Sequence, residues 1–267
     1  MPRSDERRRQ RLDDAVAQSV GITRSQARSL IMEGRVRVDG AAAGKAGQSV
    51  AAGAKVEVER PRPFVSRGGE KLDRALTAFV IDPRGMEALD IGASTGGFTD
   101  CLLQRGATSV TALDVGYGQL DWRLRNDPRV CVLERTNFRL LPNDAFPSGF
   151  DLIAIDASFI SLRTILERAV KYLRDEGVVV ALVKPQFEAG RRRVGSGGVV
   201  RQPETHRAVL REVSDAALGL GLVPVALIAS PLLGAAGNRE FFLELRRGGI
   251  PVDDARIEEV LAETPQP

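Results

Sequence analysis

The chain has 267 residues, 43% of them hydrophobic and 27% charged, a composition typical of a globular protein with one large domain or an ordinary domain plus a small module. No apolar stretch reaches the roughly 18 residues that a membrane span needs, and the first residues, MPRSDERRRQRLDD, lack the apolar core of a signal peptide. Two cysteines and one histidine are too few for a disulfide framework or a structural zinc site, so we expect a soluble cytoplasmic protein that holds no metal.

The positive charge is concentrated near the N-terminus. The whole chain has a formal charge of +3, whereas residues 1–60 carry 12 Lys/Arg against 8 Asp/Glu, a net of +4, which leaves about −1 for the rest. A local basic excess favours a polyanionic partner such as nucleic acid, through phosphate contacts and counterion release. For residues 1–10 alone, a solvated arm without a partner is the alternative.

The first 60 residues have the pattern of a small helix–turn–helix unit followed by strands. The expected elements are helices over 11–20 and 25–34, an alternating strand over 35–40 and a strand pair around Gly53 within 47–59. Thr23 or Ser25 can cap the second helix. Arg24, Arg28, Arg35 and Arg37 lie on that helix or just after it, where they can form one basic face.

The segments RLD, SQAR, GRVRVDG and VEVE resemble the alpha-L RNA-binding domain first known from a small-subunit ribosomal protein. The resemblance implies an RNA-binding domain with a basic arm over 1–60, and an ordinary small α+β cap is the alternative. The candidate RNA-binding residues of the whole chain are Arg7, Arg8, Arg24, Arg28, Arg35, Arg67 and Arg191.

RPRPFVSRGGEKL reads as a linker over 61–68 and the start of the next domain. Apolar residues at helical spacing from Leu72 to Phe79 predict an amphipathic helix that opens near Gly69, with Lys71 in its first turn. A cation is disfavoured there by the helix dipole. Lys71 is therefore either a surface lysine or a residue with a task.

From residue 86 onward, apolar β-branched runs alternate with helical patterns. The five runs MEALDIG, TSVTALDV, RVCVLE, DLIAID and GVVVALVK predict a doubly wound parallel sheet covered by helices on both faces. LVPVALIAS and NREFFLELRR then follow without a helix between them, which predicts a terminal antiparallel hairpin. This arrangement looks like the α/β, Rossmann-like class I methyltransferase fold, with a mostly parallel seven-stranded sheet over 69–250 and a tail or helix over 251–267. His206 is expected on a helix surface.

LDIGASTGGFTD joins the first strand of this sheet to a helix and has the glycines of a ligand-binding turn. It lacks the dinucleotide spacing G-x-G-x-x-G and a Walker lysine. An acidic residue at the end of the second strand, Asp114, suits ribose hydroxyls, and Asp90 suits a sulfonium better than a pyrophosphate. We therefore expect S-adenosylmethionine (SAM), unless Asp90 only caps the helix. The candidate cofactor-binding residues are Asp90, Gly92, Ser94, Thr95, Gly96, Gly97, Phe98, Asp114 and Asn137.

Three charged residues mark strand ends elsewhere in this domain. Asp156 closes the fourth strand, Lys184 closes the fifth, and Glu240 begins the antiparallel last strand. These three ends meet at one rim of the sheet, so we expect the side chains to converge there. A salt bridge that only pins the hairpin is the alternative. The run Arg191–Arg193 and Arg201 follow in a glycine-rich loop that either clamps RNA backbone or is merely solvated.

Seven motifs in order are similar to those of the TlyA/hemolysin A family of ribosomal RNA methyltransferases, whose catalytic half is similar to FtsJ-type ribose methyltransferases. The motifs are VSRGGEKL, DIGASTGGFTDCLL, DVGYGQLDWRLRNDPRV, ERTNFR, DLIAIDASFISL, VKPQFEAGR with GGVV, and GNREFF. The resemblance covers nearly residues 11–247. It implies SAM-dependent 2′-O-methylation of a ribosomal RNA cytidine, ribosomal RNA or ribosomal subunits as partners, and a catalytic tetrad of Lys71, Asp156, Lys184 and Glu240.

The chemistry agrees with that tetrad. A ribose 2′-hydroxyl is a poor nucleophile that loses its proton as it attacks, so Lys184 is expected to act as the base or to stabilise the oxyanion. The two carboxylates are expected to orient the lysines. A non-catalytic ribosome-binding or assembly factor and a membrane-active hemolysin are the rival readings. The tetrad argues against the first, and the lack of a membrane span and signal peptide argues against the second. The oligomeric state is left open.

Overall fold

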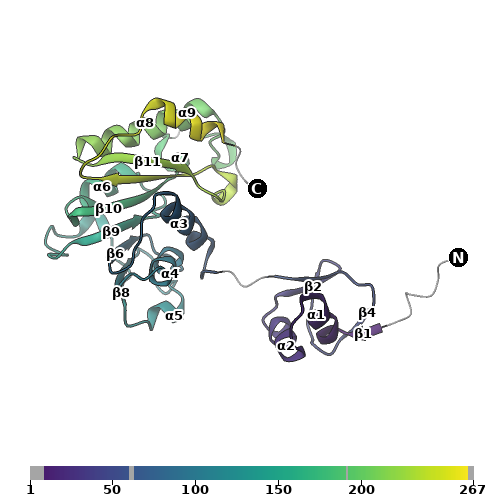
Figure 1. Ribbon diagram of the computed structural model, residues 1–267. Coiled ribbons are helices and arrows are strands. Elements are labelled where there is room, and N and C mark those ends of the chain that lie inside the picture. The colour runs from purple at the N-terminus through teal and green to yellow at the C-terminus, as the bar shows by residue number, and fades with distance from the viewer. Residues whose placement is uncertain (1–8, 60–62, 191, 264–267) are drawn as a thin grey trace. The chain divides into compact units, whose positions relative to one another are not determined.

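The computed structural model describes residues 9–59, 63–190 and 192–263 (Figure 1). Two compact units make up the chain, residues 1–62 and residues 63–267. Arg7, Arg8 and Arg191, three of the predicted RNA-binding residues, lie outside the described residues. Within the described part of the chain, no helix is long and apolar enough to cross a membrane.

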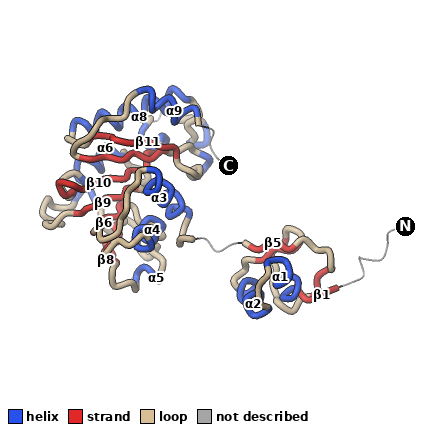
Figure 2. Tube along the Cα trace, viewed as in Figure 1, coloured by secondary structure: helices blue, strands red, loops and turns tan. Residues whose placement is uncertain are grey.

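The first unit combines two helices with short strands (Figure 2). Its elements are β1 (Arg9–Arg11), α1 (Leu12–Val20), α2 (Arg24–Met32), β2 (Val36–Val38), β3 (Ala41–Ala42), β4 (Ser49–Ala51) and β5 (Val56–Val58). Leu12, Val16 and Ala27 are fully buried between the helices and strands. Thr23 caps α2, because its hydroxyl accepts a hydrogen bond from Gln26 N while the Gln26 side chain accepts one from Thr23 N.

The expected strand pair around Gly53 is wrong in its pairing. Both strands exist, but β4 pairs antiparallel with β1, and β5 pairs antiparallel with β2. The segment RQR of β1 carries only polar side chains, so it has no apolar alternation by which to recognise a strand. With β1 available as a partner, β4 and β5 each pair elsewhere instead of closing a hairpin on each other.

The second unit contains a seven-stranded sheet with the order β11-β12-β10-β9-β6-β7-β8. The strands are β6 (Glu87–Ile91), β7 (Ser109–Leu113), β8 (Val130–Leu133), β9 (Phe150–Ile155), β10 (Leu173–Val183), β11 (Val223–Ala229) and β12 (Phe241–Arg246). Only β12 runs antiparallel to its neighbours β10 and β11. This confirms the predicted mostly parallel sheet with an antiparallel last strand.

Helices cover both faces of this sheet (Figure 1). They are α3 (Arg67–Ala78), α4 (Gly97–Gln104), α5 (Trp122–Arg125), α6 (Leu162–Ala169), α7 (Pro185–Glu188), α8 (Pro203–Gly219) and α9 (Asp254–Ala262), with short 3-10 turns at Phe138–Leu140, Ser196–Gly198 and Ala235–Gly237. Strand residues alternate between the two layers, as the period of a strand requires. In β9, Ile153 and Ile155 pack with α6 and α8, whereas Leu152 and Ala154 pack with α3 and α4.

Two sequence expectations need correction. Helix α3 begins at Arg67 rather than near Gly69, so Lys71 is its fifth residue and does not lie in the first turn. His206 is 5% exposed and packs edge-on against Phe241, because it lies on the apolar face of α8 and not on its surface. The helix expected as one possibility for 251–267 is present as α9, which buries Ile257 and Val260 in the core beside α8.

Candidate active site

The rim formed by the carboxyl ends of the parallel strands carries three of the predicted residues. Asp156 follows β9, Lys184 follows β10, and Glu240 immediately precedes β12. Each continues the alternation of its strand on the side that packs with α3 and α4, where Leu152, Leu182 and Phe242 lie. The antiparallel register of β10 and β12 ends at Val183 opposite Phe241, and one residue further it sets Lys184 beside Glu240.

Four charged side chains form two close ion pairs at this rim. Lys71 Nζ lies 2.6 Å from Glu240 Oε2, and Lys184 Nζ lies 2.6 Å from Asp156 Oδ1. The two lysine side chains are only 11% and 10% exposed. Charges this buried persist only when they are paired, so each carboxylate holds its lysine in place. The four residues that the sequence picked out are therefore brought together from α3, β9, β10 and β12.

A glycine makes room for Glu240. A Cβ atom built on Gly234 would lie 2.0 Å from Glu240 Oε1, far inside contact distance. Any side chain at this position would push the carboxylate away from Lys71.

Lys184 has a second acceptor in the loop after β9. Its Nζ donates to Ser158 Oγ at 2.7 Å and lies 3.4 Å from the backbone oxygen of Asp156. The ammonium is thus fixed between Asp156 and Ser158, with the ring of Phe187 6.0 Å away. Sequence reasoning missed Ser158. Its only signal was its position two residues after Asp156.

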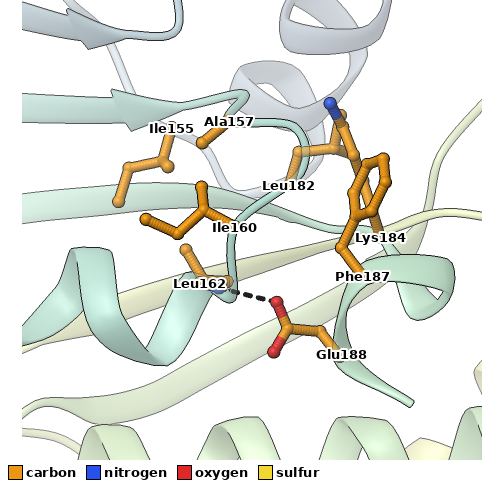
Figure 3. Close-up of a pocket in the computed structure, with 8 residues that line it drawn as sticks. All are labelled: Ile155, Ala157, Ile160, Leu162, Leu182, Lys184, Phe187 and Glu188. Atoms are coloured by element: carbon orange, nitrogen blue, oxygen red, sulfur yellow. Dashed lines mark hydrogen bonds between the residues drawn. The ribbon is translucent and has the colours of Figure 1, made fainter. Parts of the chain in front are cut away.

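Glu188 ties the segment after Lys184 to the segment after Asp156. Its carboxylate accepts hydrogen bonds from Leu162 N at 2.6 Å and Ser161 Oγ at 2.7 Å, and its side chain is 3% exposed. Figure 3 shows this carboxylate at one end of a small cavity of about 10 Å³ and Lys184 at the other. Glu188 thereby caps α6 from outside the helix and fixes the loop that carries Ser158.

The glycine-rich loop after β6 approaches the backbone of the loop after β9. Gly92 has a φ of 89°, and a Cβ built on it would lie 2.7 Å from the oxygen of Asp156. Gly96 and Gly97 instead make room for neighbouring side chains and for α3, since Cβ atoms there would strike Leu124 and Ser66. Two of the predicted cofactor glycines therefore have a packing reason within the second unit.

Asp90 caps α4, as the alternative interpretation of this residue held. Its Oδ2 accepts hydrogen bonds from Thr99 N at 2.9 Å and Thr99 Oγ1 at 2.7 Å. Its Oδ1 is buried and has no hydrogen-bond partner within the described residues. Burial raises the pKa of Asp90 to about 7, and the negative charges of Asp156 and Asp114 act in the same direction against the hydrogen bonds from Thr99.

A cavity of about 340 Å³ opens beside the rim. Its polar lining comes from predicted residues and from the loop after β9, namely Gly92, Ser94, Asp114, Asn137, Asp156 and Ser158. Asp114 holds its shape, because its two oxygens accept hydrogen bonds from Ser94 N and Gly116 N. The other predicted cofactor residues do not line it. Thr95 and Gly96 belong to the turn behind it, and Phe98 is buried against Phe242.

Comparison with known proteins identifies both units. Residues 64–247 match the model of the FtsJ-like methyltransferase family, and residues 10–56 match that of the S4 domain. The 16S/23S rRNA (cytidine-2'-O)-methyltransferase TlyA of Mycobacterium tuberculosis is 48% identical over 242 residues, 90% of each chain. Hemolysin A of Brachyspira hyodysenteriae is 40% identical and covers 86% of this chain and 97% of its own.

The chain belongs to the TlyA/hemolysin A family of FtsJ-like methyltransferases. A solved structure of a protein named as a candidate hemolysin from Streptococcus thermophilus is 42% identical, with a TM-score of 0.73 over 95% of this chain and 94% of that one. The structure of a protein named as a candidate S-adenosylmethionine-dependent methyltransferase from Listeria monocytogenes, at 16% identity and a TM-score of 0.51, shares the fold. Family membership accounts for the FtsJ-type sheet and the S4 unit, as the sequence resemblance implied.

In the S4 unit of this family member, the predicted basic face is partly engaged in holding the fold. Arg24 and Arg28 both contact the buried carboxylate of Asp13, at 3.1 and 3.0 Å, and about half of each guanidinium side chain stays exposed. Arg35 is only 20% exposed and donates to the backbone oxygen of Glu59. Arg67 is exposed at the start of α3 in the second unit.

An exposed aromatic residue lies beside Ser158 and had no sequence signal. Phe159 is 91% exposed, has a φ of 65° and contacts the ring of Phe187 at 5.1 Å between centroids. A positive φ is strained for a bulky residue, so the loop geometry is enforced by its surroundings, among them the hydrogen bonds of Ser158 and Glu188. Tyr117 and Trp122 are also mostly exposed, which argues against core packing for either ring.

Proposed function

We propose that this protein transfers a methyl group from SAM to the 2′-hydroxyl of a cytidine in ribosomal RNA. The observation that carries the proposal is the pair of buried lysine–carboxylate contacts, Lys71–Glu240 and Lys184–Asp156, at the edge of a cavity that Asp156 also lines. The printed names of the TlyA relatives support the reaction and its nucleotide.

The cavity suits SAM on the chemistry of its lining. Its volume of about 340 Å³ lies in the range of small-molecule sites. Asp114 and Asn137 offer acceptors and donors for ribose hydroxyls and an adenine edge. Asp90 does not line the cavity, but a positive charge close to its unpaired buried oxygen would lower the cost of ionising it. SAM, when bound, supplies an electrophilic methyl group on a sulfonium.

The protein's own residues hold and deprotonate the attacking hydroxyl. Lys184, oriented by Asp156 and Ser158, accepts the hydroxyl proton as a neutral amine or stabilises the oxyanion as an ammonium. Glu240 holds Lys71 at the same rim, where the positive charge of Lys71 attracts the phosphate next to the target ribose. The S4 unit, together with the basic arm before it, supplies RNA contacts through Arg24 and Arg28.

The test follows label from methyl-tritiated SAM into purified small and large ribosomal subunits. Wild-type protein is expected to label ribose, and Lys184→Ala to lose at least about 100-fold in rate, the scale of general-base catalysis. Lys184→Arg separates the two roles, because arginine keeps the charge but does not give up its proton. Loss equal to that of alanine indicates a base, and partial activity indicates oxyanion stabilisation.

Arg74→Ala is the matched control, because Arg74 is exposed on α3, the helix that carries Lys71. SAM binding by calorimetry accompanies each variant. Undiminished labelling by Lys184→Ala would remove this lysine from the chemistry. SAM binding without transfer to either subunit or to naked RNA would favour a binding factor over an enzyme.

A further inference from the structure

A second cavity lies on the catalytic unit, away from the residues that line the first. It has a volume of about 380 Å³ and is formed by the loop after α7 and the first turn of α8. We call it the arginine cavity, lined by Arg192, Arg193, Gly195, Arg201, Gln202 and Thr205. Neither this cavity nor its polar side chains take part in the two ion pairs of the rim.

Two of the three arginines carry uncompensated charge. Arg193 is neutralised by Glu212, which accepts two hydrogen bonds from its guanidinium at 2.8 and 3.1 Å. Arg192 and Arg201 are exposed, and neither makes an ion pair or a side-chain hydrogen bond to any residue that the structure describes. Two free guanidinium groups at one hollow attract an anion, and their planar donors match the oxygens of a phosphate.

A threonine in the wall of the cavity offers a neutral donor for the same ligand. Thr205 is only 9% exposed and lines the cavity, yet its hydroxyl has no hydrogen-bond partner within the described chain. This hydroxyl is therefore available to donate to a ligand in the cavity. Helix α8 adds to the effect, because its 17 residues begin here and no side chain caps it.

Hydrogen bonds connect the loop of the arginine cavity to the segment before β12. Asn238, 2% exposed, accepts a hydrogen bond from Val200 N and donates one to the oxygen of Gly198, both at 3.0 Å. It lies two residues before Glu240, whose carboxylate holds Lys71. The loop that forms one wall of the cavity is therefore hydrogen-bonded to the segment that leads into Glu240.

We propose that the arginine cavity binds one backbone phosphate of the RNA substrate and so sets the position of the strand relative to Lys184. The proposal rests on the proposed function for its choice of RNA as the anion. Its consequence is specific. Removing both free arginines removes one phosphate contact and leaves the SAM cavity untouched.

The test measures binding of a fluorescently labelled ribosomal RNA fragment to the full chain at several salt concentrations. Arg192→Ala/Arg201→Ala is expected to weaken binding about ten-fold and to make the slope of log affinity against log salt shallower by about 0.7–0.9, the range for one phosphate of a single strand or a duplex. Arg74→Ala/Arg84→Ala removes the same charge from exposed positions elsewhere on this unit and is expected to leave both quantities unchanged.

Thr205 supplies an uncharged check. Thr205→Val is expected to weaken RNA binding about three-fold with an unchanged salt slope, because valine lacks the hydroxyl but carries the same charge. Thr205→Ser keeps the hydroxyl and is expected to restore binding. SAM affinity, measured in parallel, stays at the wild-type value in every variant and shows that the unit is folded.

RNA affinity and salt slope equal to wild type in the double arginine variant would overturn the proposal, as would an equal change in the control. These outcomes are independent of the reaction. A wild-type protein that binds RNA but transfers no methyl group refutes the proposed function, while the arginine cavity stands or falls on the binding data alone.

Discussion

At the scale of single residues, Asp90 combines two demands. One carboxylate oxygen anchors the start of α4 through Thr99, and the other is buried without a partner. Burial disfavours the ionised form of this carboxylate and raises the pKa of Asp90 to about 7. A cationic ligand near the free oxygen would relieve that cost.

Asp90 is expected to make the catalytic unit less stable as the pH rises. Because its pKa is raised in the folded state, the stabilisation from its neutral form is fully present below the ordinary value of about 3.9 and is lost as the pH passes through about 7. Asp90→Asn keeps an acceptor for Thr99 but does not titrate. Urea unfolding from pH 4 to pH 8 should show wild type losing on the order of a few kcal/mol relative to this variant.

SAM affinity should depend on pH in the opposite direction to stability. If the free oxygen of Asp90 faces the cation, SAM binds more tightly to wild type at pH 8 than at pH 6, and Asp90→Asn binds weakly at both. A wild-type stability profile parallel to that of Asp90→Asn would show instead that the buried carboxylate does not titrate in this range.

At the scale of elements, Glu188 joins α7 to α6 and so couples the two loops that carry Lys184 and Ser158. Glu188→Ala removes the acceptor for Leu162 N and Ser161 Oγ, and leaves a buried N–H unpaired at a cost of about 1–3 kcal/mol. We expect the turnover rate to fall more than RNA affinity, because the loop shifts at the reacting hydroxyl.

The comparison for this variant is Glu176→Ala, an exposed glutamate on β10. Single-turnover methyl transfer, RNA binding and urea unfolding are measured on both. Equal losses of rate and of RNA affinity in Glu188→Ala would mean that Glu188 supports the fold in general and not the loop geometry.

The ends of elements were the part of the site that the sequence could predict. Asp156, Lys184 and Glu240 stand where apolar strands stop or start, and parallel topology alone brings such ends to one rim. Contacts made by turns and caps could not be predicted in this way. Glu188 accepts a hydrogen bond from Leu162 N, 26 residues away, and neither local sequence pattern indicates this contact.

The sequence pattern also could not predict which charged side chains form ion pairs with one another. The sequence shows four arginines on or after α2, but it does not show that Asp13 on α1 draws Arg24 and Arg28 toward itself. The seven strands of the second unit were predictable because each is a long apolar run. In the first unit, β1 and β3 have two or three residues and no apolar alternation.

At the scale of the whole molecule, the chain divides into two units with separate cores. The first core has few members, so its stability depends on polar contacts around Asp13. This carboxylate is fully buried and lies within 3.1 Å of Arg11, Arg24 and Arg28. Its hydrogen bond with Arg11 and those with Arg28 and Arg24 lower the pKa of Asp13 against the effect of burial.

Asp13→Asn is expected to unfold the S4 unit selectively. Three guanidinium groups lose their common acceptor charge, and the loss of a hydrogen bond to a charged group costs about 1.5–3 kcal/mol. Calorimetry of the full chain should show the transition of the first unit lowered or lost and that of the catalytic unit unmoved. RNA affinity should fall with it, while SAM affinity stays unchanged.

Asp14→Asn is the matched substitution, because Asp14 is the neighbouring, partly exposed carboxylate and, among the residues that the structure describes, forms an ion pair with Arg24 alone. A similar loss of stability in both variants, or a shift in the unfolding transition of the catalytic unit, would contradict the prediction that Asp13 stabilises the S4 unit.

The contact between Lys71 and Glu240 joins residues 169 positions apart in the chain. During synthesis, which proceeds at about 5–20 residues per second, Lys71 is made well before Glu240. Until β12 inserts between β10 and β11, Lys71 has no carboxylate partner and the sheet has no final strand. The ion pair between Lys71 and Glu240 therefore forms only when β12 has joined the sheet, and this half of the rim is complete only in the assembled second unit.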